Sequence, residues 1–429
     1  MRIGIVVFSE GFSGTLQYSL TMLRSIVQLK KEGLKDEFVI FTDNIHHPFV
    51  QRLNKLGWII DSILPTSKSK KIIKNILVKV LNVDRLGKII SQTKNNSESP
   101  AIIRDLDKKV FREDINNWFG SHKIELMIYP TSHPLAFETS IPYILSIHDL
   151  QHRLRPEFPE VSQNGEWESR EYLYRNGIKN ATLIIAESET GKQDIIKFYD
   201  KYIKKKDCIK ILPYLPSFLP QIPTLALEEK NLKLFLALPE NYLFYPAQYW
   251  PHKNHLRIIQ ALGLIKKKFK LNIPIVFCGS RSGGLKEKTF LELTSESKKL
   301  AINKNIHFLG YVNDELLPFL YKKATALVMP TFFGPTNLPI LEAWSFNCPV
   351  ITSNIQGVSD QAGNAALLVD PKSVKSIADA ILKIWKEDKF RLKLIKLGRQ
   401  RLALYSEAEY NKRLRNIIYE AEKILNETD

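Results

Sequence analysis

Short runs of consecutive apolar, often β-branched residues recur along the chain, and segments with apolar positions at helical spacing separate them. The first series occupies 2–8, 38–42, 126–130, 143–148, 183–186 and 209–213. The second series occupies 243–247, 273–279, 306–311, 326–331, 349–354 and 365–370. Strands that are apolar throughout and alternate with helices are typical of parallel sheets covered on both faces. The pattern therefore predicts two doubly wound α/β domains.

The break between the two series is rich in proline. Residues 213–223 carry four prolines at short intervals, which neither a helix nor a central strand can accommodate. We therefore predict an N-terminal domain over 1–215, a linker over 216–235 and a C-terminal domain over 236–405. Open parallel sheets bind ligands beyond the carboxyl ends of their strands, so residues directly after strands, facing a cleft between the domains, are the candidates for chemistry.

Composition narrows the class of protein. The 429 residues are 44% hydrophobic and 25% charged, which excludes a chain that is mainly disordered. The three cysteines form no CxxC pair, and no apolar run reaches the length of a membrane span, so we expect a soluble or peripheral protein of the cytoplasm. The net charge of +17 indicates an anionic partner: nucleic acid, a membrane surface or a phosphorylated substrate.

One segment holds about a third of that charge. Residues 68–88 place apolar side chains at helical spacing among seven lysines and arginines and one aspartate. A basic amphipathic helix can lie on an anionic membrane surface, for example the inner face of the cell membrane. The alternative is a surface helix whose apolar face packs on the N-terminal core.

The segment 328–344 carries the strongest chemical signal. A strand is predicted to end at Pro330, and a loop of Gly, Pro, Thr and Asn leads into a helix. The N–H groups of the residues at the helix start are then free to bind a diphosphate. These residues are Thr336, Asn337 and Leu338. Glu342 lies one turn further on, where a carboxylate can accept hydrogen bonds from a ribose; alternatively, it is an acid that suits the helix dipole.

Here the chain resembles a known family. Pro330-Thr331 and the runs 338–343 and 349–353 are similar to the donor-site signature of retaining family-4 glycosyltransferases, which have the GT-B fold. Those enzymes carry two glutamates separated by seven residues, of which the second corresponds to Glu342 and the first to Gly334. The resemblance implies that Glu342 holds the nucleotide ribose. Gly334 departs from the glutamate that approaches the transferred sugar.

The resemblance extends to other parts of the C-terminal half. In the segment 245–255, Lys253 corresponds to the lysine that the family places against the donor diphosphate, and Gln248 replaces the family's arginine. Because that positive charge is absent, Lys253 should contribute more to diphosphate binding than the lysine does in the family. The alternative is that Lys253 is only a solvated surface lysine. Tyr311 matches the strand end whose backbone contacts the base. The final residues, about 406–429, are expected to return to the N-terminal domain, as they do in the family.

In the N-terminal half, the segment 147–153 resembles the family's His-Asp strand end, and His148 is implied to reach the transferred sugar. His148 and His152 are also four residues apart, but no third ligand stands out, and we predict no metal site. The loop before Gly14 resembles the family's glycine loop near the donor phosphate, although a tight turn explains the same glycines. The pair Asp105 and Asp107 is interpreted as a solvated helix face.

The resemblance as a whole implies a retaining glycosyltransferase in which His148, Lys253 and Glu342 are catalytic. It would transfer a sugar, with mannose as the specific hypothesis, from a GDP- or UDP-linked donor to a glycan or lipid-linked acceptor in bacterial polysaccharide or lipopolysaccharide assembly. No cofactor and no nucleic-acid partner are expected. The alternatives are a GT-B-like protein that binds nucleotide sugars without turnover, and an epimerase or phosphorylase of the same fold.

Overall fold

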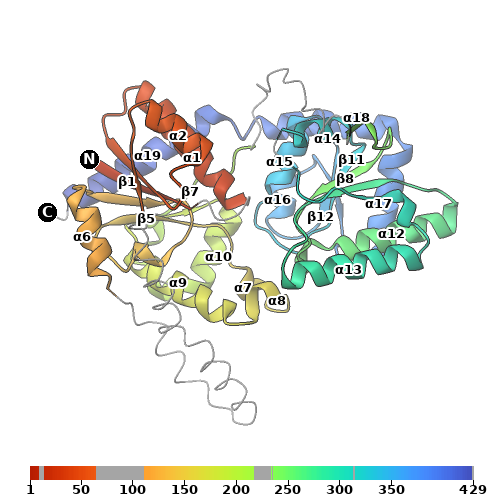
Figure 1. Cartoon of the computed structure of the whole chain (residues 1–429), viewed down its shortest axis with the longest axis horizontal. Helices are drawn as coiled ribbons and strands as arrows, with labels where there is room; N and C mark the ends of the chain where they lie inside the picture. The colour runs from red at the N-terminus through yellow and green to blue at the C-terminus, as the bar shows by residue number, and fades with distance from the viewer. Residues whose placement is uncertain (9–13, 64–110, 217–232, 234, 313–314, 428–429) are drawn as a thin grey trace, which may run out of the picture.

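The computed structural model describes residues 1–8, 14–63, 111–216, 233, 235–312 and 315–427. These residues form two parallel sheets side by side, as Figure 1 shows. The first sheet has the strand order β3-β2-β1-β4-β5-β6-β7, and the second has the order β10-β9-β8-β11-β12-β13. The strands of the first sheet are β1 (Arg2–Val7), β2 (Glu37–Thr42), β3 (Ile59–Ser62), β4 (Leu126–Tyr129), β5 (Tyr143–Ile147), β6 (Leu183–Ala186) and β7 (Ile209–Ile211). Those of the second sheet are β8 (Leu243–Pro246), β9 (Ile275–Cys278), β10 (Ile306–Phe308), β11 (Ala326–Met329), β12 (Val350–Ser353) and β13 (Leu367–Val369).

Both sheets run outward from a central strand in two directions, which is the doubly wound topology. The predicted fold class of two doubly wound parallel-sheet domains is therefore confirmed, and each of the twelve predicted runs contains an observed strand. The sequence pattern missed β3, which pairs only with β2 at the edge of its sheet. An edge strand needs no continuous apolar run, and β3 contains Asp61 and Ser62 and has no buried residue.

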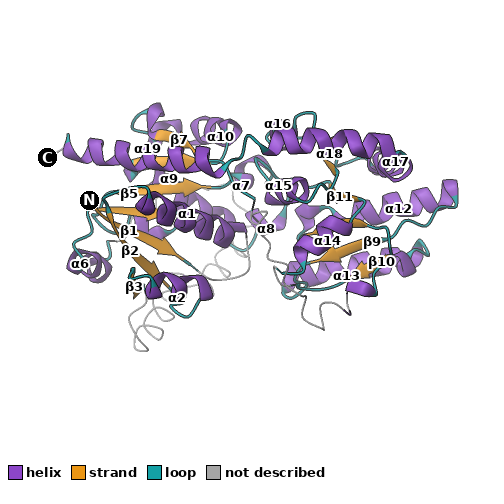
Figure 2. Cartoon of the chain, turned by 90° about the horizontal axis from the view of Figure 1, so that it is seen from above, coloured by secondary structure: helices purple, strands orange, loops and turns teal. Residues whose placement is uncertain are grey.

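Helices pack against both sheets, as the view from above in Figure 2 makes clear. In the N-terminal part they are α1 (Gly14–Lys31), α2 (Pro48–Lys55), α6 (Glu113–Ser121), α7 (Gln151–Leu154), α8 (Pro159–Ser162), α9 (Glu166–Asn180) and α10 (Glu189–Tyr199). In the C-terminal part they are α12 (His255–Phe269), α13 (Gly284–Lys299), α14 (Leu317–Lys323), α15 (Leu338–Ser345), α16 (Val358–Ala362), α17 (Val374–Lys386), α18 (Asp388–Leu402) and α19 (Glu407–Asn426).

The last helix, α19, lies against the N-terminal sheet rather than the C-terminal one, so both ends of the chain are on the same side in Figures 1 and 2. It packs beside α1 and buries Tyr410, Leu414 and Ile418 in that contact. At the surface, an ion pair joins α19 to the residue after α1, with Arg415 Nη2 2.8 Å from Glu32 Oε2. The helix thereby ties the end of the C-terminal part to the N-terminal part.

Four segments named in the sequence analysis lie outside the described residues: the loop 9–13 before Gly14, the segment 68–88, the pair Asp105 and Asp107, and most of the linker 216–235. Among the helices of the described part, none combines the length and the apolar character that a bilayer crossing requires.

Candidate functional site between the two domains

The loop that follows β11 is fixed by hydrogen bonds from neighbouring segments. Thr331 Oγ1 donates to the carbonyl of His252 at 3.3 Å, and Ser353 Oγ donates to the carbonyl of Thr331. At the far end of the loop, the Gln361 side chain brackets the backbone of Asn337: its Oε1 accepts from the Asn337 N–H at 2.8 Å, and its Nε2 donates to the carbonyl at 3.0 Å. The prediction of a free Asn337 N–H is therefore wrong, because Gln361 already satisfies it.

Two helices begin at the same place between the domains. α15 begins at Leu338 with Pro339 in its first turn, where a missing N–H breaks no helical hydrogen bond. α1 begins at Gly14 in the opposite domain, and a Cβ atom at this glycine would lie 3.5 Å from Leu338 Cδ1. The positive ends of both helix dipoles therefore converge between the domains, which favours a bound anion such as a diphosphate.

Lys253 lies on the turn between β8 and α12. The carbonyl of Lys253 accepts a hydrogen bond from the Tyr245 hydroxyl at 3.1 Å. The following residue, Asn254, has a φ of 62° and donates through Nδ2 to the carbonyls of Pro330 at 2.7 Å and Pro371 at 2.8 Å. This turn is thus attached to the loop that follows β11.

The ammonium of Lys253 faces acidic side chains of the other domain. Burial lowers the pKa of Lys253 from 10.5 to about 8, although the charges of Asp149 and Glu160 raise it. A lysine with that pKa is mostly protonated at pH 7 but holds its proton less tightly than a solvated lysine. A bound phosphate would add negative charge beside Lys253 and so favour the protonated form of this lysine.

Gln248 and Tyr311, two further residues of the predicted donor site, contribute no charge to it. Gln248 uses its Oε1 to accept a hydrogen bond from Trp250 Nε1 at 3.1 Å. Tyr311 is 50% exposed and follows Gly310, whose φ is 70° and whose carbonyl accepts from the Gly279 N–H. Neither arrangement places a charged group in the site, so the charge of Lys253 is not supplemented by these residues.

Glu342 is buried near the middle of α15 with 8% of its surface exposed. Its Oε2 accepts a hydrogen bond from the Tyr321 hydroxyl at 2.8 Å. Burial and the charge of Glu342 hold the pKa of Tyr321 well above its usual value of 10, so this hydroxyl is a hydrogen-bond donor throughout the physiological range. The carboxylate is therefore oriented before any ligand binds.

His148 follows β5 directly. It belongs to the N-terminal wall of the site, and Lys253 and the start of α15 belong to the C-terminal wall. Its Nδ1 is hydrogen-bonded to Glu187 Oε1, and the Tyr214 hydroxyl lies 3.4 Å from the same nitrogen. Tyr18 packs edge-on against the ring, with the ring centres 5.0 Å apart. Burial lowers the pKa of His148, but the charge and hydrogen bond of Glu187 raise it by more, so the pKa lies above 6.5. Among the described residues, Nε2 is buried and has no hydrogen-bond partner.

Two hydrogen bonds connect this wall to the loop that follows β11. Gln151 Nε2 donates to the carbonyl of Gly334 at 2.8 Å, and Thr336 Oγ1 donates to Glu187 Oε2 at 2.8 Å. Gly334 also lies close to the next loop, because a Cβ atom there would be 3.2 Å from the carbonyl oxygen of Gln356. The structure therefore brings together the predicted residues His148, Gly334 and Thr336.

The short helix α8 forms a second contact between the domains, and it lies between them in both overall views. An apolar cluster joins Phe158 and Val161 to the Phe332 and Phe333 side chains. Beside it, Glu160 Oε1 accepts hydrogen bonds from the His252 ring at 2.6 Å and from the His252 N–H at 3.0 Å. This contact lies next to Lys253 in the chain and keeps the two walls together.

Three residues of the site were missed by the sequence analysis: Glu187, Gln151 and Glu160. Glu187 had a usable signal, because it directly follows β6 just as His148 directly follows β5. Gln151 and Glu160 lie on short helices, and nothing in their local sequence indicates which loop of the other domain they contact.

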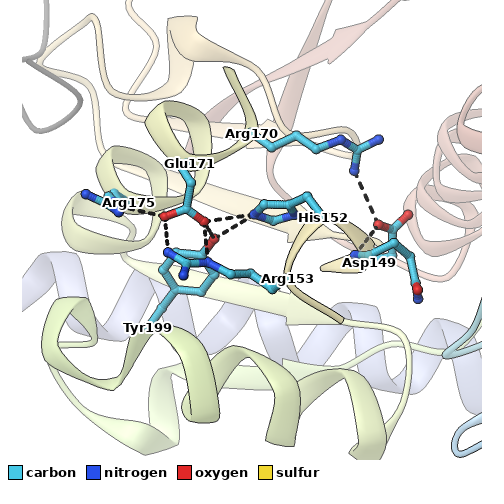
Figure 3. A network of polar contacts seen from close by, with 8 residues as sticks. Asp149, His152, Arg153, Arg170, Glu171, Arg175 and Tyr199 are labelled. Atoms are coloured by element: carbon cyan, nitrogen blue, oxygen red, sulfur yellow. Dashed lines mark hydrogen bonds and ion pairs between the residues drawn. The ribbon is translucent and has the colours of Figure 1, made fainter. Parts of the chain in front are cut away.

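The two histidines that could have suggested a metal ion bond to different carboxylates. His148 pairs with Glu187, whereas His152 Nε2 lies 2.9 Å from Glu171 Oε1, in a network with Arg153, as Figure 3 shows. Within the residues that the structure describes, no group of three or more His, Cys, Asp or Glu side chains has a geometry suited to a metal ion.

Comparison with known proteins agrees with this geometry. Residues 228–401 match the family model described as "Glycosyl transferases group 1". The curated O-antigen chain mannosyltransferase B of Escherichia coli is 28% identical over 233 residues, which is 54% of this chain and 59% of that protein. The chain thus spans about three fifths of the length of this relative.

Solved structures match over nearly the whole chain. A glycosyltransferase from Rickettsia africae aligns with a TM-score of 0.62 and 16% identity, covering 99% of this chain and 98% of that one. Anabaena HepE, solved in complex with UDP-glucose, aligns with a TM-score of 0.65 and 14% identity, covering 98% of this chain and 99% of that one. At such identities the likeness concerns the fold, and it confirms the predicted GT-B architecture.

Proposed function

We propose that this protein is a retaining glycosyltransferase that takes a sugar from a nucleoside diphosphate sugar. The observation that carries the proposal is the arrangement of the two walls. Lys253, the start of α15 and Glu342 lie on one side, and His148 lies on the other, joined to it through the Glu187–Thr336 hydrogen bond. The match of residues 228–401 to group 1 glycosyltransferases supports the same conclusion.

In the proposed reaction, the bond between the sugar C1 and the diphosphate oxygen breaks while the acceptor oxygen bonds to C1. Lys253 and the N-terminus of α15 stabilise the charge that develops on the departing diphosphate. The acceptor proton passes to a phosphate oxygen on the same face of the sugar, which requires no second carboxylate. His148 Nε2 would bind a hydroxyl group of the transferred sugar. The residues supply the positive charge themselves, so the proposal includes no resident cofactor.

The proposed substrates follow from the relatives. The E. coli protein is named an O-antigen chain mannosyltransferase, which supports mannose as the sugar and a glycan acceptor in surface polysaccharide assembly. We propose a GDP-linked donor for the mannose, and a lipid-linked form of the acceptor. The complex of HepE supports a UDP-linked donor as the alternative. With such acceptors, the protein would work at the inner face of the cell membrane.

The test combines binding and transfer. Calorimetry with GDP-mannose, UDP-glucose and the free nucleotides identifies the donor, and mass spectrometry after incubation with a membrane extract detects the product. We expect micromolar to millimolar donor binding and a product heavier by one hexose. Binding without transfer or hydrolysis would support a non-catalytic nucleotide-sugar-binding protein, and an altered free sugar would support an epimerase.

Replacing Glu342 with alanine is expected to weaken nucleotide binding by about 1.5–3 kcal/mol, because a hydrogen bond to a charged group contributes that much. Replacing Tyr321 with phenylalanine removes only the hydroxyl that orients Glu342 and should weaken binding by about 0.5–1.5 kcal/mol. Calorimetry with the nucleoside diphosphate measures both. Equal affinities for the wild type and the alanine variant would assign Glu342 to the helix dipole instead.

A further inference from the structure

Glu187 is a buried carboxylate at the centre of the interface, with a side-chain exposure of 2%. It directly follows β6 and precedes α10, so its backbone is fixed by the sheet and its side chain lies between the domains. A buried carboxylate is costly unless hydrogen bonds satisfy it. Here each of its two oxygens has a different partner, and the partners come from different domains.

The first oxygen determines the protonation of His148. A carboxylate only accepts hydrogen bonds, so His148 Nδ1 must carry the hydrogen that binds Glu187 Oε1. In the neutral ring, the other nitrogen then has a free lone pair, and in the charged ring it has a hydrogen. In both states Nε2 is the atom that remains for a ligand, because it is buried and has no partner among the described residues.

The second oxygen responds to the C-terminal domain. Glu187 Oε2 accepts from the hydroxyl of Thr336, which lies two residues before α15 begins at Leu338. If the domains separate, this hydrogen bond breaks and the carboxylate loses its partner from the C-terminal domain, while His148 and Tyr214 remain beside it. The state of His148 is thereby linked to the position of the loop that precedes α15.

We propose that Glu187 is a positioning residue, which holds His148 in the form protonated at Nδ1. Glu187 holds the ring firmly only when Thr336 of the other domain also donates a hydrogen bond to it. The consequence for transfer rests on the proposed glycosyltransferase function. The consequence for the histidine ring does not, because it follows from the two hydrogen bonds alone.

Other groups around His148 cannot replace this carboxylate. Asp149 is the neighbouring residue in the chain, and its Oδ1 accepts from Arg170 Nη1 at 3.3 Å and from the Gln151 N–H at 3.0 Å. Tyr18 and Tyr214 face the ring from α1 and from the segment after β7. Burial raises the pKa of both phenols far above neutrality, so they are uncharged.

The direct test is nitrogen-15 NMR of the histidine side chains in the full-length protein, with the His148 signal assigned by its loss in H148Q. We expect the wild-type ring to be protonated at Nδ1 in its neutral form and to have a pKa above 6.5. Glu187→Gln removes the charge but preserves the shape, so the pKa of His148 should fall, since burial is then opposed only by the charge of Asp149 and the Pro130 carbonyl. The matched control is Glu189→Gln, an exposed glutamate on the first turn of α10. An Nε2-protonated neutral ring in the wild type, or the same pKa in both glutamine variants and the wild type, would overturn the proposal.

The kinetic test uses the domain contact. Glu187→Gln should lower kcat by about 10- to 100-fold, which is typical when the partner that orients a functional group is lost. The donor KM should change by less than about threefold, because the diphosphate and ribose contacts remain. Thr336→Val should lower kcat by about 5- to 10-fold, and Thr336→Ser, which retains the hydroxyl, should restore most of it.

The outcomes separate the two proposals. Absence of nucleotide-sugar binding and transfer in the wild type would refute the proposed function, while the NMR titration would still decide the role of Glu187. Normal transfer by the wild type, together with full kcat in Glu187→Gln, would refute the positioning role alone. Thermal unfolding of each variant checks that the fold is retained.

Discussion

Replacing Lys253 with methionine is expected to lower the turnover of sugar transfer by about 100- to 1,000-fold, the loss that follows removal of one group that stabilises developing charge. Gln248 stands where the related enzymes carry an arginine, and its Oε1 is engaged by Trp250, so it offers no replacement for the lost cation. The measurement is the steady-state rate with the donor identified by calorimetry. The matched control is Lys267→Met, which removes an exposed lysine from α12 in the same domain.

Thermal unfolding separates a catalytic from a structural role for this lysine. Burial makes the charged form of Lys253 costly, so the methionine variant should unfold at the same temperature as the wild type or at a higher one. A lower unfolding temperature with a proportionate loss of activity would instead make Lys253 a structural residue.

The pKa of Lys253 adds a pH dependence to the same experiment. A lysine carries its charge below its pKa, so donor affinity should fall as the pH rises from 7 to 9, through the value of about 8. The two histidines next to Lys253 do not titrate in this range, because burial lowers the pKa of His252 to about 4 and that of His255 to about 3. Glu160 stays ionised here, because hydrogen bonds from His252 outweigh burial and lower the pKa of this carboxyl group. Lys253→Arg should abolish this fall, since a guanidinium keeps its charge at pH 9.

The fold was largely predictable because most strands are buried on both faces. Leu183–Ala186 illustrates this: all four side chains are buried, so the residues are apolar throughout the strand. β3 breaks the rule because it is an edge strand, and its sequence of Ile59, Ile60, Asp61 and Ser62 has only half of the apolar signal.

The candidate site was predictable where one strand end or one helix start creates it. Thr336 was predicted from the helix start that follows β11, and His148 from the resemblance of the segment after β5 to a family strand end, so both predictions depend on local sequence. The contacts that join the two walls depend on how the domains sit together. Local sequence cannot show that Gln361 satisfies Asn337, or that Glu187 connects His148 to Thr336, because the partners are 24 and 149 residues apart.

Replacing Glu171 with glutamine is expected to lower the free energy of unfolding by about 3–5 kcal/mol, the cost of breaking a buried ion pair by removing one partner. Glu171 is fully buried on α9. Its carboxylate accepts from Arg153 Nε at 2.6 Å, from the Tyr199 hydroxyl at 2.6 Å and from Arg175 Nε at 2.8 Å, as Figure 3 shows. A neutral amide leaves both guanidinium groups without the charge that compensates their partial burial. Urea unfolding measures the effect.

The hydrogen bonds of Glu171 also hold α7, which carries a residue of the candidate site. Arg153 and His152 lie on α7, which begins at Gln151, the residue that donates to Gly334 of the other domain. Loosening α7 should therefore reduce transfer as well as stability. The matched control, Glu168→Gln, changes an exposed glutamate on α9, the helix that carries Glu171, and should alter the free energy of unfolding by less than about 0.5 kcal/mol.

The pH dependence of the difference identifies the carboxylate as its source. Hydrogen bonds from His152, Arg153 and Tyr199 outweigh the effect of burial and hold the pKa of Glu171 far below its usual value of 4.5. A carboxyl group with a depressed pKa stabilises the fold above its unfolded pKa, and this contribution is lost as the pH falls towards the native value. The difference between the wild type and Glu171→Gln should therefore be constant from pH 8 to pH 6 and shrink below about pH 4.5. A difference that stays the same at pH 3 would mean that side-chain packing, and not the charge of Glu171, stabilises α7.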